Sequence, residues 1–362
     1  MNGRVPATQL FARGPTPEMR KMNIVFDGVS KIVNGTTHIH SISFTLESGA
    51  TNVILGHTLS GKTSLLRLMA GLDRPNKGRI LLSGKDVTGL FVRKRSVAMV
   101  YQQFVNYPSM TVYDNIASPL RMSRMPAAQI DQTVRKTAAM LHIETLLDRL
   151  PSELSGGQQQ RTAIARSLVK DSELLLLDEP LVNLDYKLRE ELQVELQDIF
   201  KERKAIVVYT TTEPAEALML GGNILVIDEG RLLQTGSTPE VYHQPVNTRV
   251  AEVFSDPPIN FLPARVVGRT ARLGEDIEIR MTEHLEAVPD GRYIFGVRPN
   301  HLFLQDGDPD NVTIRVKVIL AEINGSETFL HIPQGQTHLC EKETGFHPRH
   351  IRQKWPVLVK PD

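Results

Sequence analysis

Short apolar runs alternate with longer amphipathic stretches from residue 22 to about residue 234. The runs have the length and continuous hydrophobicity of strands buried on both faces. They cover residues 52–55, 97–100, 174–177, 205–209 and 224–227. Apolar residues at helical spacing predict helices over residues 62–70, 130–141, 158–169 and 188–203. Strands that alternate with helices predict an α/β fold with a mostly parallel sheet covered on both faces.

The pattern changes near residue 236. Asp228, Glu229 and Gly230 predict a hairpin that closes the α/β domain. A connector over residues 237–262 then leads to short strand-like segments without a long helix, which predict a small β-barrel or sandwich. These segments cover residues 264–267, 277–281, 293–297, 312–320 and 327–332. Residues 334–362 lose the alternation and mix Pro, His and Arg, so we expect an irregular tail there.

Residues 1–21 differ from the rest of the chain. They contain four basic residues, one acidic residue and three prolines, without the apolar segment of a secretory signal. The composition weakly resembles a transit peptide. A disordered extension, or a translation start placed upstream of Met22, accounts for it better. We therefore expect an extension over 1–21, an α/β domain over 22–236, and a connector with a β domain over 237–362.

Composition narrows the classes of function. Lysine and arginine number 42 against 41 acidic residues, a balance that argues against a nucleic-acid-coating protein. Cys340 is the single cysteine, which excludes an internal disulfide and fits a reducing compartment. The apolar runs are far shorter than the ~20 residues that span a bilayer. A membrane-spanning partner protein remains compatible with this composition.

A glycine-rich segment between the first buried strand and the first helix fits the phosphate-loop pattern G-x-x-x-x-G-K-[ST]. Backbone N–H groups and the helix N-terminus favour phosphate binding there. Lys62 supplies a charge to the β- and γ-phosphates, and the Thr63 hydroxyl ligates Mg²⁺. A glycine turn that merely precedes a lysine is the alternative. The predicted contacts are Gly56, His57, Thr58, Leu59, Ser60, Gly61, Lys62, Thr63 and Ser64.

A second motif, Leu174 to Leu177 followed by Asp178 and Glu179, predicts a buried strand that ends in two acids. Asp178 is placed near Mg²⁺, and Glu179 can polarise the attacking water. The motif is weak alone. Because this motif follows a phosphate loop in the same chain, the two together predict nucleotide hydrolysis.

Between these motifs stands Leu-Ser-Gly-Gly-Gln at residues 154–158, and Asn-Leu-Asp follows at 183–185. Together they resemble the ATP-binding cassette (ABC) ATPases over roughly residues 22–333. In that family two cassettes dimerise head to tail, and each ATP lies between one phosphate loop and the partner's signature. The resemblance implies nucleotide contacts by Ser155, Gly156, Gly157, Gln158 and Asp185. A flexible Ser-Gly-Gly linker is the alternative, although a helical pattern follows immediately.

Further segments resemble the importer branch that takes up sugars, polyols and related solutes. They are residues 107–116, 242–245, 260–263 and 296–299. The resemblance makes Gln102 a contact to metal and water that also senses the membrane partner, and it implies an OB-like regulatory C-terminal domain. Tyr293 and Phe329 are ligand contacts or core aromatics there, and core packing is favoured.

Three positions depart from the family pattern. Thr212 stands where the family has a catalytic histidine, and threonine is shorter and uncharged. Val33 stands where an adenine-stacking aromatic is expected; His38 or His40 can substitute, though both are better explained as ordinary strand residues. Leu59 takes a position that is usually glycine, where strain is a hypothesis.

These departures all belong to the site on this chain's own phosphate loop, whereas the signature is intact. We expect a heterodimer with a second ABC ATPase, one site weak and one competent, and the chain resembles one of the paired ATPases of glycerol-type importers. A second copy of this chain is the alternative partner. The implied partners are integral membrane permease subunits and, indirectly, a periplasmic solute-binding protein, with the chain at the cytoplasmic face of the membrane. A largely non-hydrolytic subunit is the alternative. A DNA-repair or translation cassette, and a small-molecule kinase, fit less well.

Overall fold

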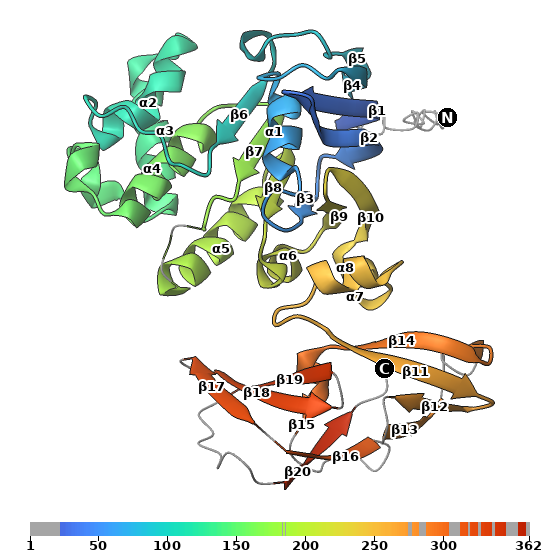
Figure 1. Cartoon of the computed structure of the whole chain (residues 1–362). Helices are drawn as coiled ribbons and strands as arrows, with labels where there is room; N and C mark the ends of the chain where they lie inside the picture. Colours follow the sequence, from blue (N-terminus) through green and yellow to red (C-terminus); the bar gives the residue numbers. More distant parts are fainter. Residues whose placement is uncertain are drawn as a thin grey trace, which may run out of the picture.

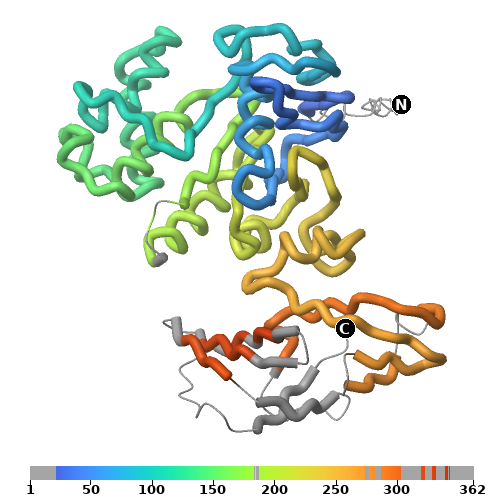
Figure 2. Tube along the Cα trace, viewed as in Figure 1, coloured from blue at the N-terminus to red at the C-terminus, as the bar shows by residue number. Residues whose placement is uncertain are grey.

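The computed structural model describes most of the chain beyond its first residues (Figure 2). The described residues are 22–182, 184, 186–273, 277–281, 287–303, 312–317, 319–324, 327–334, 337–344 and 354–359. The predicted extension over residues 1–21 therefore lies outside the described residues, as does Asp185.

A six-stranded sheet forms the centre of the first domain, in the order β10-β9-β3-β8-β7-β6 (Figure 1). Every neighbouring pair is parallel except β9 and β10, which form the predicted hairpin. The mostly parallel sheet is thus confirmed. The strands are β3 (Thr51–Leu55), β6 (Val97–Val100), β7 (Leu174–Asp178), β8 (Ile206–Thr211), β9 (Asn223–Asp228) and β10 (Arg231–Ser237).

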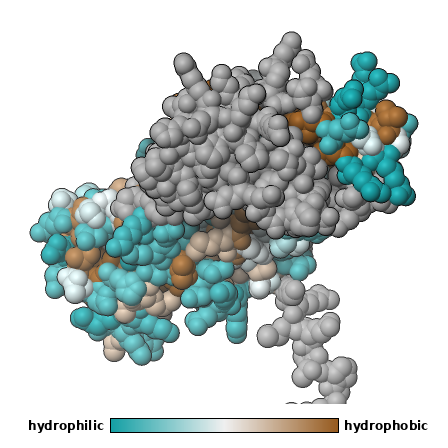
Figure 3. Space-filling model, turned by 90° about the horizontal axis from the view of Figure 1, so that it is seen from below, coloured by the Kyte–Doolittle hydropathy of each residue, from teal (hydrophilic) through white to brown (hydrophobic). Residues whose placement is uncertain are grey.

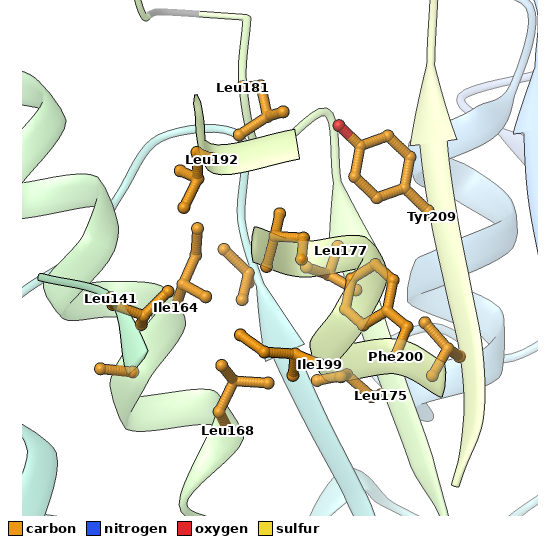
Figure 4. Packing of buried hydrophobic residues seen from close by; sticks show 14 of the residues in the cluster. Leu141, Ile164, Leu168, Leu175, Leu177, Leu181, Leu192, Ile199, Phe200 and Tyr209 are labelled. Atoms are coloured by element: carbon orange, nitrogen blue, oxygen red, sulfur yellow. The ribbon is translucent and has the colours of Figure 1, made fainter. Parts of the chain in front are cut away.

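Both faces of the five parallel strands are buried, which explains why these strands are continuously apolar, whereas the edge strand β10 is partly exposed. Leu175 and Leu177 of β7 face one core with α4 and α5, and Figure 4 shows this packing. Leu174 and Leu176 face a second core on the opposite side with α1. The helices are α1 (Lys62–Ala70), α2 (Val112–Met122), α3 (Ala127–Met140), α4 (Gly156–Leu168), α5 (Tyr186–Lys201) and α6 (Pro214–Leu220), with 3₁₀ turns Val92–Lys94, Glu144–Leu146 and Pro151–Glu153.

An antiparallel sheet packs over α1, and the sequence pattern did not predict it. Its order is β2-β1-β4-β5. The strands are β1 (Asn23–Val33), β2 (Thr36–Glu47), β4 (Lys77–Leu82) and β5 (Lys85–Asp86). Phe26 and Phe44 stack with ring centroids 4.6 Å apart, and both belong to the core shared with α1. One face of the sheet is exposed, so its strands alternate and lack the continuous apolar run that identifies buried strands.

The connector contains α7 (Thr238–His243) and α8 (Thr248–Val253), and the sheets beyond it are all antiparallel. Their orders are β13-β12-β11-β14, β15-β20-β16 and β17-β18-β19. The strands are β11 (Asn260–Val267), β12 (Thr270–Leu273), β13 (Ile277–Arg280), β14 (Gly291–Val297), β15 (Leu302–Phe303), β16 (Val312–Lys317), β17 (Leu320–Asn324), β18 (Glu327–Gln334), β19 (Thr337–Thr344) and β20 (Lys354–Val359), and a 3₁₀ turn covers Pro299–His301. The predicted β domain is confirmed.

Two expectations about this domain are wrong. The predicted strand over 312–320 is two strands, β16 and β17, which belong to different sheets. The tail predicted as irregular contributes β19, paired with β18, and β20, paired with β16. β19 forms a hairpin with the neighbouring β18, and β20 pairs with the distant β16, so pairing overrides the local pattern of Pro, His and Arg.

Candidate nucleotide-binding site

The phosphate loop connects β3 to α1, as predicted. Gly61 caps α1 at a φ of 105°, a conformation that suits glycine. A Cβ on Gly56 would lie 2.3 Å from the Ile227 carbonyl oxygen, so only glycine fits there. The N–H of Gly230 donates to the Ser60 carbonyl at 2.9 Å. The loop is therefore held against the turn between β9 and β10, with the α1 N-terminus available to an anion.

Leu59, near the tip of this loop, has a φ of 67° and is 96% exposed. A left-handed backbone is unfavourable for a residue with a Cβ, and this side chain gains no burial in return. The strain hypothesised from the sequence is therefore present in the structure.

Lys62 is buried, and its ammonium group is fully engaged. Nζ donates to the carbonyl oxygens of Gly56 and His57 at 2.7 and 2.9 Å, and it lies 3.1 Å from Glu179 Oε1. Burial lowers the pKa of Lys62, and the Glu179 carboxylate opposes that shift. The ammonium is thus positioned between the phosphate loop and the end of β7.

Asp178 ends β7 and faces the start of α1. The Thr63 hydroxyl donates to Asp178 Oδ1 at 3.2 Å. Burial raises the pKa of Asp178, and hydrogen bonds from Thr210 and Thr63 oppose the shift. A hydroxyl beside a buried carboxylate is a donor set that fits Mg²⁺, which takes its other ligands from phosphate and water. No group of three or more His, Cys, Asp or Glu residues in the described part of the chain forms a complete metal site.

Gln102 and Glu179 meet at the same place. Gln102 follows β6, and its Nε2 donates to Glu179 Oε2 at 3.0 Å. Glu179 has a φ of 42°, which turns the chain sharply at the end of β7. The structure therefore brings together five of the predicted site residues, Lys62, Thr63, Gln102, Asp178 and Glu179.

The Ser-Gly-Gly segment begins α4 rather than forming a linker. The N–H of Gln158 donates to Ser155 Oγ at 3.4 Å, and the N–H of Ser155 donates to Gln158 Oε1 at 3.1 Å. Gly156 is exposed, and a Cβ added to it would have no neighbouring atom closer than 4.0 Å, whereas Gly157 is buried against Leu188. In Figure 1, α4 and α1 lie on opposite sides of β6, so the two motifs are far apart within one chain.

Comparison with known proteins decides the family. Residues 39–182 match the ABC transporter family. The chain is 38% identical to the trehalose/maltose import ATP-binding protein MalK of Thermococcus litoralis, over 85% of this chain and 87% of that protein. It is 35% identical to the sn-glycerol-3-phosphate import ATP-binding protein UgpC of Cereibacter sphaeroides, over 92% and 93%. The chain belongs to the ABC transporter ATP-binding proteins.

A solved structure supports the fold of this ABC ATPase. It is the ATP-binding cassette MJ0796 in a dimeric post-hydrolysis state bound to ADP and Pi, with a TM-score of 0.54 and 25% identity. The match covers 59% of this chain and 98% of that cassette. Among the described helices of the ABC ATPase, none is both long and apolar enough to cross a membrane. The described surface in Figure 3 is mainly hydrophilic, with hydrophobic residues in small groups.

The remaining predicted residues lie in the phosphate loop and at the ends of β1 and β8. Val33 is half-buried at the end of β1, beside the turn of Asn34 and Gly35, and Thr212 is half-buried directly after β8. Neither supplies an aromatic ring or an imidazole. Within the loop, His57 and Thr58 are exposed, Ser60 is buried, and Ser64 is half-buried in α1. The family roles of these residues remain predictions.

Tyr293 and Phe329, the two aromatic residues singled out in the β domain of this ABC protein, have different surroundings. Tyr293 packs against the core of that domain, and its hydroxyl donates to the Pro289 carbonyl at 2.9 Å. Phe329 is half-buried, and Lys342 Nζ lies 5.8 Å from its ring centre.

Thr210 was missed from the sequence, where it is only one of three consecutive threonines. Its hydroxyl donates to Asp178 Oδ1 at 3.0 Å and accepts from the N–H of Glu179 at 3.0 Å. The sequence did carry one indication: Thr210 is a polar residue in a strand that is otherwise buried and apolar. A buried hydroxyl requires a hydrogen-bond partner.

Proposed function

We propose that this chain binds Mg·ATP on its own phosphate loop and works with a second, different ABC ATPase to energise an importer of a small polar solute of the sugar, polyol or glycerol class. The observation that carries the proposal is the convergence of Lys62, Thr63, Gln102, Asp178 and Glu179 at the carboxyl ends of β6 and β7. These groups supply the charge, metal ligands and base that phosphoryl transfer to water needs.

Each residue has a role in this proposal. Lys62 binds the β- and γ-phosphates, while Thr63 and Asp178 hold Mg²⁺, which neutralises phosphate charge when bound. Gln102 orients the attacking water, and a Glu179 carboxylate oxygen takes its proton. Removing this base alone is expected to slow hydrolysis by about 100-fold or more.

The separation of the two motifs supports a dimer. Ser155 and Gly156 lie exposed at the start of α4, away from the phosphate loop of the same chain. The Ser155 N–H is already bonded to Gln158, but the N-terminus of α4 beginning at the exposed Gly156 favours an anion outside the chain. We propose that Ser155 and Gly156 contact the nucleotide of the second ATPase, as Asp185 does in the family pattern.

Asymmetry between the two sites follows from where the departures lie. Thr212, Val33 and the strained Leu59 belong to this chain's own site, whereas the signature is complete. We propose that this site hydrolyses slowly and that the competent site uses this chain's Ser155. Intact Asp178 and Glu179 favour residual hydrolysis over the fully non-hydrolytic alternative.

Integral membrane permease subunits and a periplasmic solute-binding protein complete the proposed assembly, with this chain at the cytoplasmic face of the membrane. No nucleic acid partner is proposed. The test is ATP hydrolysis by the purified assembly with its cognate second ATPase, comparing Lys62→Ala with Ser155→Ala.

Asymmetry predicts that Ser155→Ala reduces turnover far more than Lys62→Ala. Because Ser155 also caps α4, thermal unfolding of each variant is measured as a control, with a cap loss of about 1 kcal/mol expected. Equal losses in both variants would contradict asymmetry. Fast turnover by this chain alone, abolished by Glu179→Gln, would also contradict it.

A further inference from the structure

Thr210 lies directly opposite Asp178 in the register of β7 and β8, and its side chain is completely buried. Its hydroxyl donates to Asp178 Oδ1 at 3.0 Å and accepts from the N–H of Glu179 at 3.0 Å. One hydroxyl thus contacts the carboxylate of one residue and the backbone of the next. These two residues are the acids assigned above to metal binding and to the base.

The two hydrogen bonds use the single proton of the hydroxyl and one of its lone pairs. A threonine hydroxyl has one proton to donate and lone pairs to accept. The alternative acceptor, the Leu177 carbonyl, lies farther away at 3.4 Å. The Thr210 hydroxyl therefore donates its proton to Asp178, and one of its lone pairs accepts the N–H of Glu179. A valine of the same shape would remove both hydrogen bonds and leave the Glu179 N–H without this acceptor.

The same carboxylate oxygen receives a second hydroxyl. Thr63 and Thr210 both donate to Asp178 Oδ1, one from α1 and one from β8. Two donors on one oxygen fix the rotation of the carboxylate. Groups that hydrogen-bond a metal-binding carboxylate in this way control its orientation and its affinity for the metal.

Thr210 also holds the backbone turn that places Glu179. Glu179 has a φ of 42°, an unfavourable value for a residue with a Cβ, so surrounding contacts must maintain it. The hydrogen bond from its N–H to Thr210 is such a contact. A small change in that turn would move the carboxylate relative to Lys62 and Gln102.

We propose that Thr210 is a positioning residue, which sets the Asp178 carboxylate and the Glu179 turn for Mg·ATP. The inference rests on the magnesium site of the proposed function. The adjacent Thr211 does a different task, because its hydroxyl donates to Glu216 Oε2 at 2.7 Å on the other side of β8. Both threonines are buried, so the same substitution at Thr211 is a matched control.

The test measures the affinity of the full-length chain for trinitrophenyl-ATP by fluorescence, with Mg²⁺ and with EDTA. Thr210→Val should weaken binding about tenfold with Mg²⁺ and leave binding in EDTA unchanged. Thr210→Ser, which keeps the hydroxyl, should bind like the unaltered protein in both buffers. Thr211→Val should lose thermal stability while keeping the ratio of the two affinities.

Each other outcome is decisive. If Thr210→Val binds like the unaltered protein, or loses affinity equally in both buffers, Thr210 has only a structural role and the inference is wrong. Failure of Thr210→Ser to restore the Mg²⁺-dependent affinity would also overturn it. If the unaltered chain binds equally with and without Mg²⁺, the proposed magnesium site itself fails, which distinguishes the two proposals.

Discussion

The Lys62 ammonium lies 3.1 Å from Glu179 Oε1, so the phosphate-binding charge and the proposed base form an ion pair. Lys62 is almost fully buried, and Glu179 is also held by Gln102 Nε2 at 3.0 Å. In the proposed function, phosphate oxygens compete with the Glu179 carboxylate for this ammonium. The proposed phosphate ligand and the proposed base are therefore linked through one short contact.

The exposed, left-handed Leu59 offers a test of strain. Leu59→Gly should stabilise the protein by about 1 kcal/mol, because glycine adopts this backbone without a Cβ penalty. Leu59→Ala is the matched control: it removes the same exposed side chain but keeps the Cβ. Thermal unfolding measures both. A stability of Leu59→Gly at or below that of Leu59→Ala would contradict strain at this position.

A substitution at Gly156 tests dimerisation separately from the stability of the fold. A Cβ there has open space, with Phe104 Cζ the nearest atom at 4.0 Å. Gly156→Ala should therefore change the free energy of unfolding by no more than about 0.5 kcal/mol. It should nevertheless weaken ATP-dependent association with the second ATPase, because the backbone here must approach a phosphate.

Light scattering with Mg·ATP measures the association of Gly156→Ala. Gly89→Ala, at another exposed glycine with open space, is the control and should associate normally. Normal association of Gly156→Ala would count against a role for this glycine at the interface.

Glu216 makes stability depend on pH. Burial raises its pKa, and hydrogen bonds from Thr211 and Tyr209, with the charge of Arg189, oppose the shift. The folded protein therefore binds this proton more tightly than the unfolded chain does, and the resulting stability is lost as pH rises through the raised pKa. Glu216→Gln keeps an acceptor oxygen and does not ionise.

The melting temperature of Glu216→Gln relative to the unaltered protein should consequently increase between pH 4.5 and pH 8. Glu202→Gln, at an exposed position on the surface, controls for the general effect of removing an acid. A difference that is constant across this range, or that decreases as the pH rises, would show that Glu216 has no such pKa shift.

Arg298 connects the β domain to the connector helices. It is buried, its guanidinium lies 4.0 Å from the Tyr242 ring centre, and it donates to the carbonyls of Phe254 and Tyr242 at 2.9 and 2.8 Å. Arg298→Met keeps the apolar volume but leaves these carbonyls unpaired, which should cost about 2 kcal/mol. Calorimetry should show the β domain unfolding earlier.

Arg292→Met, on the exposed face of β14, is the matched control for Arg298→Met and should unfold like the unaltered protein. Equal unfolding curves for the two variants would exclude this role of Arg298.

Features that depend on neighbouring residues in the sequence were predicted better than features that depend on strand pairing. The buried strands of the parallel sheet, the phosphate loop and the N-terminus of α4 depend on neighbouring residues, and the structure has them where they were predicted. The sheet of β1, β2, β4 and β5 alternates between exposed and buried residues and was not predicted. Strands β19 and β20 were wrongly expected to be irregular: β20 pairs with the distant β16, and the hairpin of β19 with β18 lacks a clear alternation of apolar and polar residues.

The sequence by itself determined the family and the α/β and β folds, and it predicted Lys62, Thr63 and Asp178 as site residues, since these follow from patterns within short segments. Only the tertiary structure decided which hydrogen bonds form at Asp178 and Glu179, among them the unpredicted bonds of Thr210. Thr210 and Gln102 come from positions 32 and 77 residues away, on β8 and after β6. Parallel strand order and register bring them together, and neither is encoded in a local pattern.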